Sequence, residues 1–366
     1  MHIPVEGYLK TIVKNPSLRD IIAQHFFENT PAFFALGYFC LYLNYFYPKG
    51  GVGKLSEALK NKTLEFGINL LPETKIIEVI PDKNLVIDQN NISYHYDNLI
   101  WSADLKTFYK IVKTEGLAPK IRTKFEQTKT KMLENRGADS VFSLFLEVNE
   151  PLESFRKIAC GHFFYTPSKT GLGETHRGEL NYLLRNFEKV EKEQILMWLD
   201  KFTKLNTYEI SIPGLKDPEL VPPGKSSVII SLLAEYNLFK KIQKAGWLDE
   251  FISELENRIL SVISDSIYPM LKDKIISRFS YTPLSIENRV GSSEGSIVGW
   301  AFQKSMPVVN KIQFSDSSVL TPIPSIYQAG QWAYSPAGVP MSILTGKLAA
   351  NKILKKWKNI SFETKQ

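Results

Sequence analysis

The sequence has few cysteines and no grouping of residues typical of metal sites. Its two cysteines are Cys40 and Cys160, and its five histidines lack the close spacing that zinc ligands share. A small domain held together by disulfides or zinc is therefore excluded. We expect no metal site, a structural role for each histidine and a reducing compartment.

Long apolar runs that could cross a membrane are also scarce. The uncharged run Pro31–Tyr47 just reaches the roughly 17 residues that a spanning helix needs, and it contains Asn44 and many aromatic residues. We expect a buried helix or a pocket wall there, with membrane contact or a membrane span as the alternatives. The N-terminal residues MHIPVEGYLK lack a basic segment followed by an apolar one, so we predict no signal peptide. A cytoplasmic protein is expected, with peripheral membrane contact left open.

A concentrated patch of one charge is missing as well. The net charge of +7 is spread along the chain, and hydrophobic residues make up 43%, an ordinary value for a globular protein. Two short lysine clusters occur in predicted helices: Lys124, Lys129 and Lys131, and Lys352, Lys355, Lys356 and Lys358. We interpret both as solvated helix faces and expect no nucleic acid partner.

The glycine fingerprint of a complete dinucleotide-binding domain is the last absence. No G-x-G-x-x-G occurs in the chain, and Gly171-Leu172-Gly173 is followed by Glu174, Thr175 and His176. In complete domains this loop holds the pyrophosphate at a helix N-terminus.

A strand–loop–helix pattern near the C-terminus is the most informative feature present. A short apolar segment at 325–329 leads to Gly330, a Pro/Gly loop and a helix predicted to start at Pro340, where a missing N–H costs nothing. Free N–H groups and the positive end of the helix dipole at such a site favour a phosphate or another anion.

The rest of the chain alternates between strand and helix patterns, which indicates a mixed α/β fold. Strands are predicted at 75–80, 85–88, 93–96, 98–101, 139–148, 208–212, 226–233 and 275–281, with a hairpin turn at Asn90-Asn91. Helices are predicted at 55–66, 105–135, 188–202 and 237–265, and loops at 166–180 and over most of 283–325.

The loop Lys49–Lys54, KGGVGK, allows three interpretations. As a P-loop it would bind nucleotide phosphates, but that motif needs Ser or Thr after the second lysine, and Leu55 stands there. Pro48 also precedes the loop, where a P-loop normally follows a buried strand. The second interpretation is a glycine turn before an amphipathic helix, and the third is a flavin-contacting turn.

The third interpretation rests on a resemblance that runs along the chain. Tyr47–Leu59 resembles the Y-P-x-G-G-x-x-x-L-x-x-A-L segment of phytoene desaturase and carotenoid isomerase-like flavoproteins, within the amine-oxidase superfamily. Further similar segments follow in the family's order: Glu73–Ile80, Asp97–Asp104, Lys216–Lys225, Tyr281–Asn288 with Gly291–Trp300, and the GQW-x5-GVP-x3-LTGKLAA run from Gly330. Gln331 takes a position where many relatives carry an acidic residue.

The resemblance implies a partial FAD-binding domain that lacks its first βαβ unit, interleaved with a substrate domain of mixed sheet and helices. The implied division is substrate-domain helices at 1–46, FAD-domain parts at 47–104 and 285–357, a substrate-binding domain at 105–284 and a tail at 358–366. The implied FAD-binding residues are Gly50, Gly51, Ile76, Gly330, Gln331, Gly338, Val339 and Pro340.

The implied chemistry is hydride transfer between the flavin and an apolar polyene or lipid. Candidate substrate walls are Phe33–Tyr47 and Val141–Leu146. No catalytic residue is evident, since Glu294, Tyr334 and His176 are each better explained as structural or exposed. Because the family opens with a strand and G-x-G-x-x-G, a separate N-terminal flavin-binding chain is a possible partner. A non-catalytic remnant or partner subunit, and the P-loop protein, stay open as alternatives.

Overall fold

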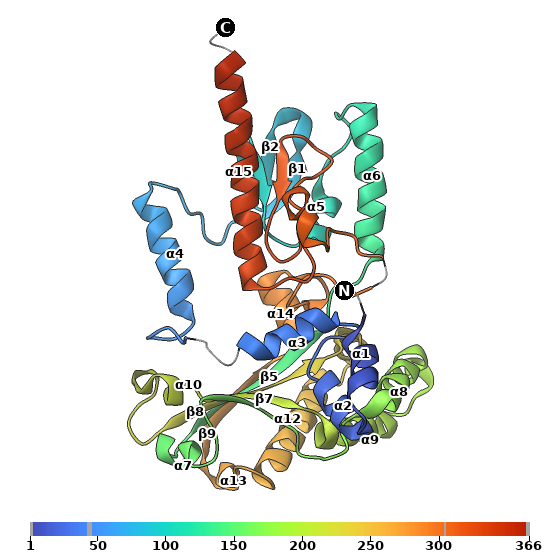
Figure 1. Ribbon diagram of the computed structural model, residues 1–366, viewed down its shortest axis with the longest axis vertical. Helices are drawn as coiled ribbons and strands as arrows, with labels where there is room; N and C mark the ends of the chain where they lie inside the picture. Colours follow the sequence, from blue (N-terminus) through green and yellow to red (C-terminus); the bar gives the residue numbers. More distant parts are fainter. Residues whose placement is uncertain (1–2, 42–45, 304, 364–366) are drawn as a thin grey trace. The chain divides into compact units, whose positions relative to one another are not determined.

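A computed structural model describes residues 3–41, 46–303 and 305–363 (Figure 1). The chain forms two compact units, each built from two separated stretches. The first unit comprises residues 1–69 and 140–285, and the second comprises residues 70–139 and 286–366. Both combine helices and strands, which confirms the predicted α/β class. The predicted domain bounds assign segments to cofactor or substrate binding, and they stay a prediction.

The first unit is built on a five-stranded antiparallel sheet in the order β6-β7-β8-β5-β9. The strands are β5 (Ser140–Val148), β6 (His162–Tyr165), β7 (Tyr208–Ser211), β8 (Ser226–Ala234) and β9 (Ile275–Tyr281). Buried and half-buried residues alternate strictly along β5 and β8. One face of the sheet is therefore a core face, as the period of two in a strand requires.

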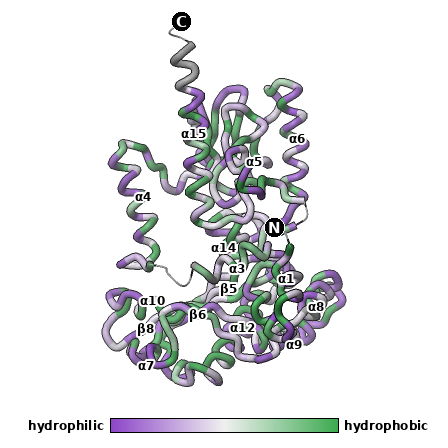
Figure 2. Tube along the Cα trace, in the orientation of Figure 1, coloured by the Kyte–Doolittle hydropathy of each residue, from purple (hydrophilic) through white to green (hydrophobic). Residues whose placement is uncertain are grey.

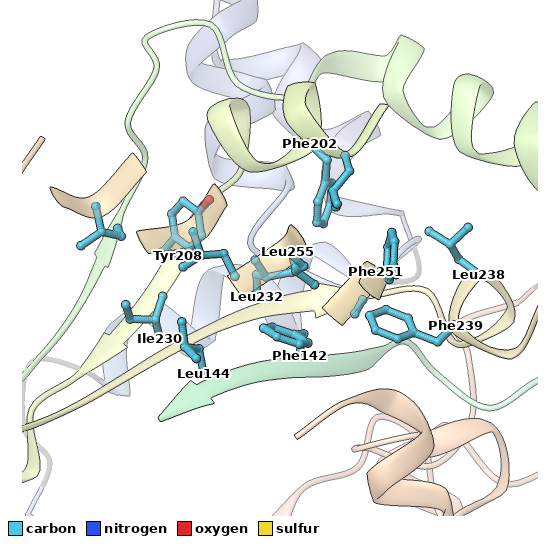
Figure 3. Close-up of a cluster of buried hydrophobic side chains, with 14 of the residues drawn as sticks. Phe142, Leu144, Phe202, Tyr208, Ile230, Leu232, Leu238, Phe239, Phe251 and Leu255 are labelled. Atoms are coloured by element: carbon cyan, nitrogen blue, oxygen red, sulfur yellow. The ribbon is translucent and has the colours of Figure 1, made fainter. Parts of the chain in front are cut away.

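Helices cover that core face. They are α7 (Leu152–Arg156), α8 (Gly173–Arg185), α9 (Lys192–Leu205), α10 (Pro213–Lys216), α11 (Tyr236–Lys244), α12 (Leu248–Ser264) and α13 (Leu271–Lys274), and α14 (Pro283–Val290) follows the last strand. Figure 3 shows Phe142 and Leu144 of β5 on the side of the sheet that faces the helices carrying Phe202 and Leu255, and all four belong to one buried cluster. The strongly buried side chains make this the larger hydrophobic core of the chain.

Four helices precede the sheet in the first unit: α1 (Val5–Ile12), α2 (Pro16–Ala23), α3 (Ala32–Leu41) and α4 (Gly53–Glu65). The helix predicted at 55–66 is thus confirmed, although none of the α4 residues is buried. The run Pro31–Tyr47 forms α3 as far as Leu41, and its residues 42–45 lie outside the described part of the chain. Ala35 is buried there and Phe33 is exposed.

The second unit contains a small antiparallel sheet, β1-β2-β3, and a parallel pair of strands, β10 and β4. The strands are β1 (Ile76–Ile80), β2 (Leu85–Asp88), β3 (Ser93–His95), β4 (Leu99–Trp101) and β10 (Ile326–Gln328). Three helices, α5 (Leu105–Ile111), α6 (Pro119–Glu134) and α15 (Val339–Glu363), complete it. The predicted turn is confirmed: Asn91 has a φ of 62°, and the Asp88 carboxylate accepts hydrogen bonds from the N–H groups of Asn90 and Ile92.

The loop predicted at 166–180 is wrong in part, because a helix starts within it, whereas 283–325 is mostly loop as predicted but includes one helix. Residues 166–180 include the start of α8. The sequence of this helix is mostly polar, but Leu183 on one of its faces is buried. Residues 283–325 include α14, which starts at Pro283. The Thr282 N–H donates to Ser285 Oγ, and the Ser285 N–H donates to Thr282 Oγ1. This reciprocal cap is a local start signal that the sequence analysis missed.

Two predicted long helices are each divided. The 105–135 segment forms α5 and α6, because Val112 leaves the helix to pair with Val79 of β1. The 237–265 segment forms α11 and α12, with Gly246 at a φ of 82° between them. Positive φ is readily adopted by glycine and ends a helix.

The described residues contain no helix that is both long and apolar enough to cross a bilayer. In the same part of the chain, no three side chains among His, Cys, Asp and Glu are grouped so that they could hold a metal ion. Cys40 and Cys160 are both free thiols at exposed positions.

Candidate functional site

The candidate site in the second unit lies where two parallel strands end. Leu99 and Trp101 of β4 align with Ile326 and Gln328 of β10, so both strands point to the same edge. In open α/β sheets ligands bind beyond the carboxyl ends of parallel strands. Gly330 lies two residues after the end of β10 at this edge.

Gly330 allows three segments to approach closely. Its φ is 83°, and a β-carbon placed on it would lie 2.8 Å from the carbonyl oxygen of Ser102, the residue after β4. Its N–H donates to Thr345 Oγ1 in the second turn of α15 at 3.0 Å. The glycine therefore joins both strand ends to the C-terminal helix.

Substituting Gly330 with alanine should lower the free energy of unfolding of the second unit by about 2 kcal/mol. Alanine costs about 1–2 kcal/mol in a left-handed conformation, and the Ser102 carbonyl belongs to the backbone and cannot swing away. Urea denaturation followed by circular dichroism would measure the change. Gly346→Ala is the matched control, because apart from its chain neighbours and the nearby backbone of its own helix no atom lies within 4 Å of its β-carbon position, and it should be neutral or stabilising by up to about 1 kcal/mol. Equal losses in both variants would contradict a packing role for Gly330.

The N-terminus of α15 presents its first residues at the surface. α15 begins at Val339, one residue before the predicted Pro340, and both residues are exposed. The first helical bond of this turn runs from the Ser342 N–H to the Gly338 carbonyl. The N-terminus of a helix as long as α15 attracts anions through its free N–H groups and the helix dipole.

The GQW segment packs on the glycine-rich segment that ends at Trp300. The indole N–H of Trp300 donates to the Trp332 carbonyl at 2.8 Å, and the two rings meet edge to face at 4.8 Å. A β-carbon on Gly299, whose φ is 81°, would lie 2.4 Å from the carbonyl oxygen of Gln331. Two segments that resemble the flavoprotein family separately are therefore in direct contact.

A buried ionic network supports this contact. Lys106 of α5 is 5% exposed, and its Nζ lies 2.6 Å from Glu294 Oε1. Glu294, at a φ of 60°, also accepts the N–H of Gly137. Asp104 caps α5 by accepting the Thr107 N–H and also accepts the N–H of Ser293. The network fixes the chain before α5 against the 293–296 turn.

The other two predicted glycines, Gly50 and Gly51, lie in the first unit. The Gly50 N–H donates to Asp217 Oδ2 at 2.6 Å, and Lys216 Nζ lies 4.7 Å from the centre of the Tyr47 ring. Burial is the main cause of the lowered pKa of Lys216, and the Glu209 and Cys160 charges oppose it. The segments Tyr47–Leu59 and Lys216–Lys225 are thus brought together. No local sequence pattern predicts the contact between these two segments.

The open face of the five-stranded sheet is the candidate substrate surface of the first unit. Two rows cross this face: Phe164, Glu209, Ser231, Ser143 and Tyr281, and His162, Ser211, Ile229, Phe145 and Phe279. The rings of Phe145 and Phe279 stack at 4.8 Å, whereas the Ser143 and Ser231 hydroxyls are hydrogen-bonded at 2.8 Å. His162 Nε2 lies 2.8 Å from Glu209 Oε1. Aromatic rings therefore gather on the β5–β9 side of the face, and polar side chains lie among the other strands together with Phe164.

The predicted wall Val141–Leu146 needs correction. Phe142, Leu144 and Leu146 point into the core, because alternate residues of β5 face opposite sides of the sheet. Val141 and Phe145 are half-buried on the open face. An uninterrupted apolar wall along this strand is thus ruled out.

The three residues considered as catalytic candidates, Glu294, Tyr334 and His176, all make contacts that explain them as structural residues. Glu294 is held by Lys106, and Tyr334 is buried, which raises its pKa. His176 packs against both Trp198 and Phe202 in the core of the first unit, and the three ring centroids lie 4.9 to 5.2 Å from one another. Burial lowers its pKa to about 4. None of the three is therefore assigned a catalytic role.

The structure places the predicted cofactor residues in two groups. The second unit holds Ile76 at the start of β1, and it holds Gly330, Gln331, Gly338, Val339 and Pro340 between β10 and α15. The first unit holds Gly50 and Gly51. Their joint role in binding FAD stays a prediction.

Known proteins with similar sequences are carotenoid-modifying enzymes. The chain is 22% identical over 339 residues to the phytoene desaturase of Fusarium fujikuroi, covering 84% of this chain and 51% of that protein. It is 21% identical over 365 residues to the carotenoid 3,4-desaturase of Haloarcula japonica, covering 96% of this chain and 64% of that protein. The chain thus spans about half to two thirds of the length of these relatives. No family model matches the sequence.

Solved structures with a similar fold are amine oxidases. Putrescine oxidase bound to putrescine superimposes with a TM-score of 0.55 at 12% identity, over 96% of this chain and 68% of that one. Cyclohexylamine oxidase from Brevibacterium oxydans gives a TM-score of 0.51 at 9% identity, over 95% and 67%. These matches confirm the predicted resemblance: the chain is related in sequence to phytoene and carotenoid desaturases and shares its fold with amine oxidases.

Proposed function

We propose that this chain forms the larger part of an FAD-dependent oxidoreductase of the carotenoid desaturase type. The observation that carries the proposal is the strand–Gly330–helix junction of the second unit, which lies in the stretch that the desaturase relatives match. Such an enzyme moves a hydride between flavin and an apolar polyene or lipid. The cofactor supplies the redox chemistry, and the protein supplies position and polarity.

The residues at this junction fit a dinucleotide. Gly330 keeps the edge beyond β4 and β10 free of side-chain bulk, and the exposed N-terminus of α15 offers a positive dipole end. Gln331 is neutral and can both donate and accept hydrogen bonds, so it adds no negative charge beside a phosphate. Gly338, Val339 and Pro340 would line the pyrophosphate side, and the main chain of Ile76 would contact the adenine.

The open sheet face of the first unit would bind the substrate. Phe145, Phe279 and Ile229 offer an apolar surface for a polyene chain, and Ser143 and Glu209 offer polar contacts next to it. A polyene of this kind resides in lipid, so peripheral contact with a membrane belongs to the proposal. No acid or base of this chain is assigned to the reaction.

Flavin retention would also require a G-x-G-x-x-G segment. The sequence contains none, and the match to the phytoene desaturase covers only 51% of that protein. A separate N-terminal flavin-binding chain is the proposed partner. The same observation favours the alternative of a non-catalytic remnant or partner subunit.

The test is to fuse the first strand, glycine loop and helix of a phytoene desaturase to this chain and purify the product. We expect a bound flavin, seen in the absorption spectrum, and conversion of phytoene to products that absorb at longer wavelength. Bound flavin without conversion under any electron acceptor would favour the non-catalytic alternative. A folded but colourless fusion would overturn the proposal.

The P-loop alternative has less support from the geometry. The Gly50 N–H, which would face a phosphate, is engaged by the Asp217 carboxylate, and Lys54 Nζ is paired with Glu57 at 2.7 Å. Titration with Mg²⁺-ATP provides the check. Binding that is lost on Lys54→Ala would replace our proposal with this one.

A further inference from the structure

A cavity of about 480 Å³ lies in the first unit between helix α12 and the first residues of β9. Hydrophobic and hydrophilic residues are mixed along α12, as its colouring in Figure 2 helps to follow. The helix lines the cavity with Asn257, Leu260, Ser261 and Ser264, which share one side because they are three or four positions apart. A cavity of this volume lies in the range of small-molecule sites.

The cavity lies on the helix-covered side of the sheet edge. β9 is the outermost strand, and Arg278 pairs directly with Leu146, which faces the core. Side chains of directly opposed residues lie on the same face, so Arg278 leaves the sheet toward α12. There its Nε lies 3.1 Å from Glu256 Oε2. Phe279, the next residue, points to the opposite face, so the sheet separates the cavity from the candidate substrate surface.

A β-bulge shapes the strand beside the cavity. Glu147 pairs with Ser277, whereas the next residue of β5, Val148, pairs with Ile275, so Ile276 is an additional residue. The extra residue of a bulge is not paired in the regular ladder, and bulges often redirect a side chain near a binding site. Ile276 is 47% exposed and lines the cavity together with the half-buried Ile275. The bulge thus supplies an apolar wall.

The lining combines this wall with cationic hydrogen-bond donors. Among the described residues, the lining includes two cations, Arg278 and Lys272, and no carboxylate. Each cation also holds a carboxylate nearby, Glu256 for Arg278 and Asp265 for Lys272. A guanidinium group has five N–H donors, and its contact with Glu256 leaves several of them available. An anion in the cavity would therefore be bound by directed N–H groups and not by an excess of positive charge.

A buried hydroxyl in the lining lacks a partner. Ser264 is 3% exposed, and its Oγ has no hydrogen-bond partner in the described part of the chain. Buried polar groups are nearly always hydrogen-bonded, so an unpaired one requires an explanation. Leu260 and Leu271 belong to the same lining and offer apolar surface. A ligand with a hydrogen-bond acceptor and an apolar part would match both features.

We propose that this cavity binds the carboxylate of a small molecule with an apolar chain, such as a medium-chain fatty acid. The carboxylate accepts hydrogen bonds from Arg278 and Ser264, and the chain lies against Leu260, Leu271 and Ile276. A carboxylate fits because a guanidinium group can donate to both of its oxygens in parallel. The site is independent of the proposed function, since neither flavin nor the open sheet face takes part in it.

The test is a calorimetric titration of the 366-residue chain with octanoate in the absence of flavin. We expect saturable binding that Arg278→Lys weakens at least tenfold, because lysine keeps the charge beside Glu256 but lacks the planar fork. Ser264→Ala should weaken binding at least threefold without destabilising the fold, because it removes an unpaired hydroxyl. Arg258→Lys is the matched control. Arg258 is also on α12, its Nη2 lies 3.0 Å from Glu254, and it is outside the lining, so binding should not change.

Four outcomes would overturn the proposal. The first is the absence of octanoate binding. Octanol that binds as tightly as octanoate would show an apolar cleft without carboxylate recognition. Binding that persists in both Arg278→Lys and Ser264→Ala, with unchanged circular dichroism, would place octanoate elsewhere. Binding that is lost in Phe279→Ala but kept in Arg278→Lys would place it on the open sheet face, and the proposed function would still stand.

Discussion

Replacing Lys106 with methionine should lower the free energy of unfolding of the second unit by about 3 kcal/mol. Lys106 is 5% exposed, and its ammonium group lies 2.6 Å from the Glu294 carboxylate. Removing one member of a buried ion pair leaves the other charge poorly solvated, which costs about 3–5 kcal/mol when both are fully buried. We expect a loss at the lower end of this energy range because the Glu294 side chain is 28% exposed.

Two further variants test that explanation. Lys113→Met removes a lysine whose Nζ lies 3.3 Å from Glu78 but whose side chain is 54% exposed, and it should change stability by less than about 0.5 kcal/mol. Adding Glu294→Gln to Lys106→Met should recover part of the loss, because the amide can still accept the Gly137 N–H without carrying a charge. Urea unfolding with hydrogen exchange at 100–110 and 290–300 gives the measurement. Equal losses for Lys106→Met and Lys113→Met would show that burial of the pair is unimportant.

The network around Glu294 also shows what local sequence could and could not predict. Strands with clear patterning were predicted closely, and 85–88 and 275–281 match β2 and β9 residue for residue. The missed helices α8 and α14 depend on weaker signals, namely a polar surface over a buried Leu183 and the cap between Thr282 and Ser285. Both signals are local, and the spacing of Thr282 and Ser285 in the sequence is enough to predict the helix cap.

Contacts between distant segments are a different matter. The sequence singled out Gly330 because a glycine between a strand and a helix has a physical meaning. It did not indicate that Asp217 would bind the Gly50 N–H or that Lys106 would meet Glu294, because these pairs are separated by 167 and 188 residues. Such pairings are set by the packing of whole elements, and a single sequence carries no periodicity that reports them.

Acidification from pH 6.5 to pH 4 should destabilise the first unit, and His176 should account for up to about 3 kcal/mol of the loss. Burial lowers the pKa of His176 to about 4 from an ordinary value of 6.5, with Lys201 and Arg177 adding to the effect and Glu179 opposing it. Its Nδ1 is buried without a hydrogen-bond partner, and the ring is stacked on Trp198 at 5.1 Å. A protonated ring would therefore hold a poorly solvated charge in the core.

The sign follows from proton uptake. The unfolded chain binds a proton at His176 near pH 6.5, whereas the native chain does so only near pH 4, so stability is complete above the higher value and falls as the pH drops between them. A difference of about 2.5 in pKa corresponds to about 3 kcal/mol. His25, whose pKa burial also lowers to about 4, should add to the loss with the same sign.

Urea unfolding of the wild type, His176→Leu and His176→Leu/His25→Leu at several pH values between 4 and 7.5 would separate the contributions of the two histidines. We expect the slope of stability against pH to decrease stepwise along this series, because leucine keeps the apolar packing and cannot take up a proton. A slope that stays unchanged in His176→Leu would mean that the ring is protonated in the native core at little cost, and the stacked arrangement with Trp198 and Phe202 would then have to open to water near neutral pH.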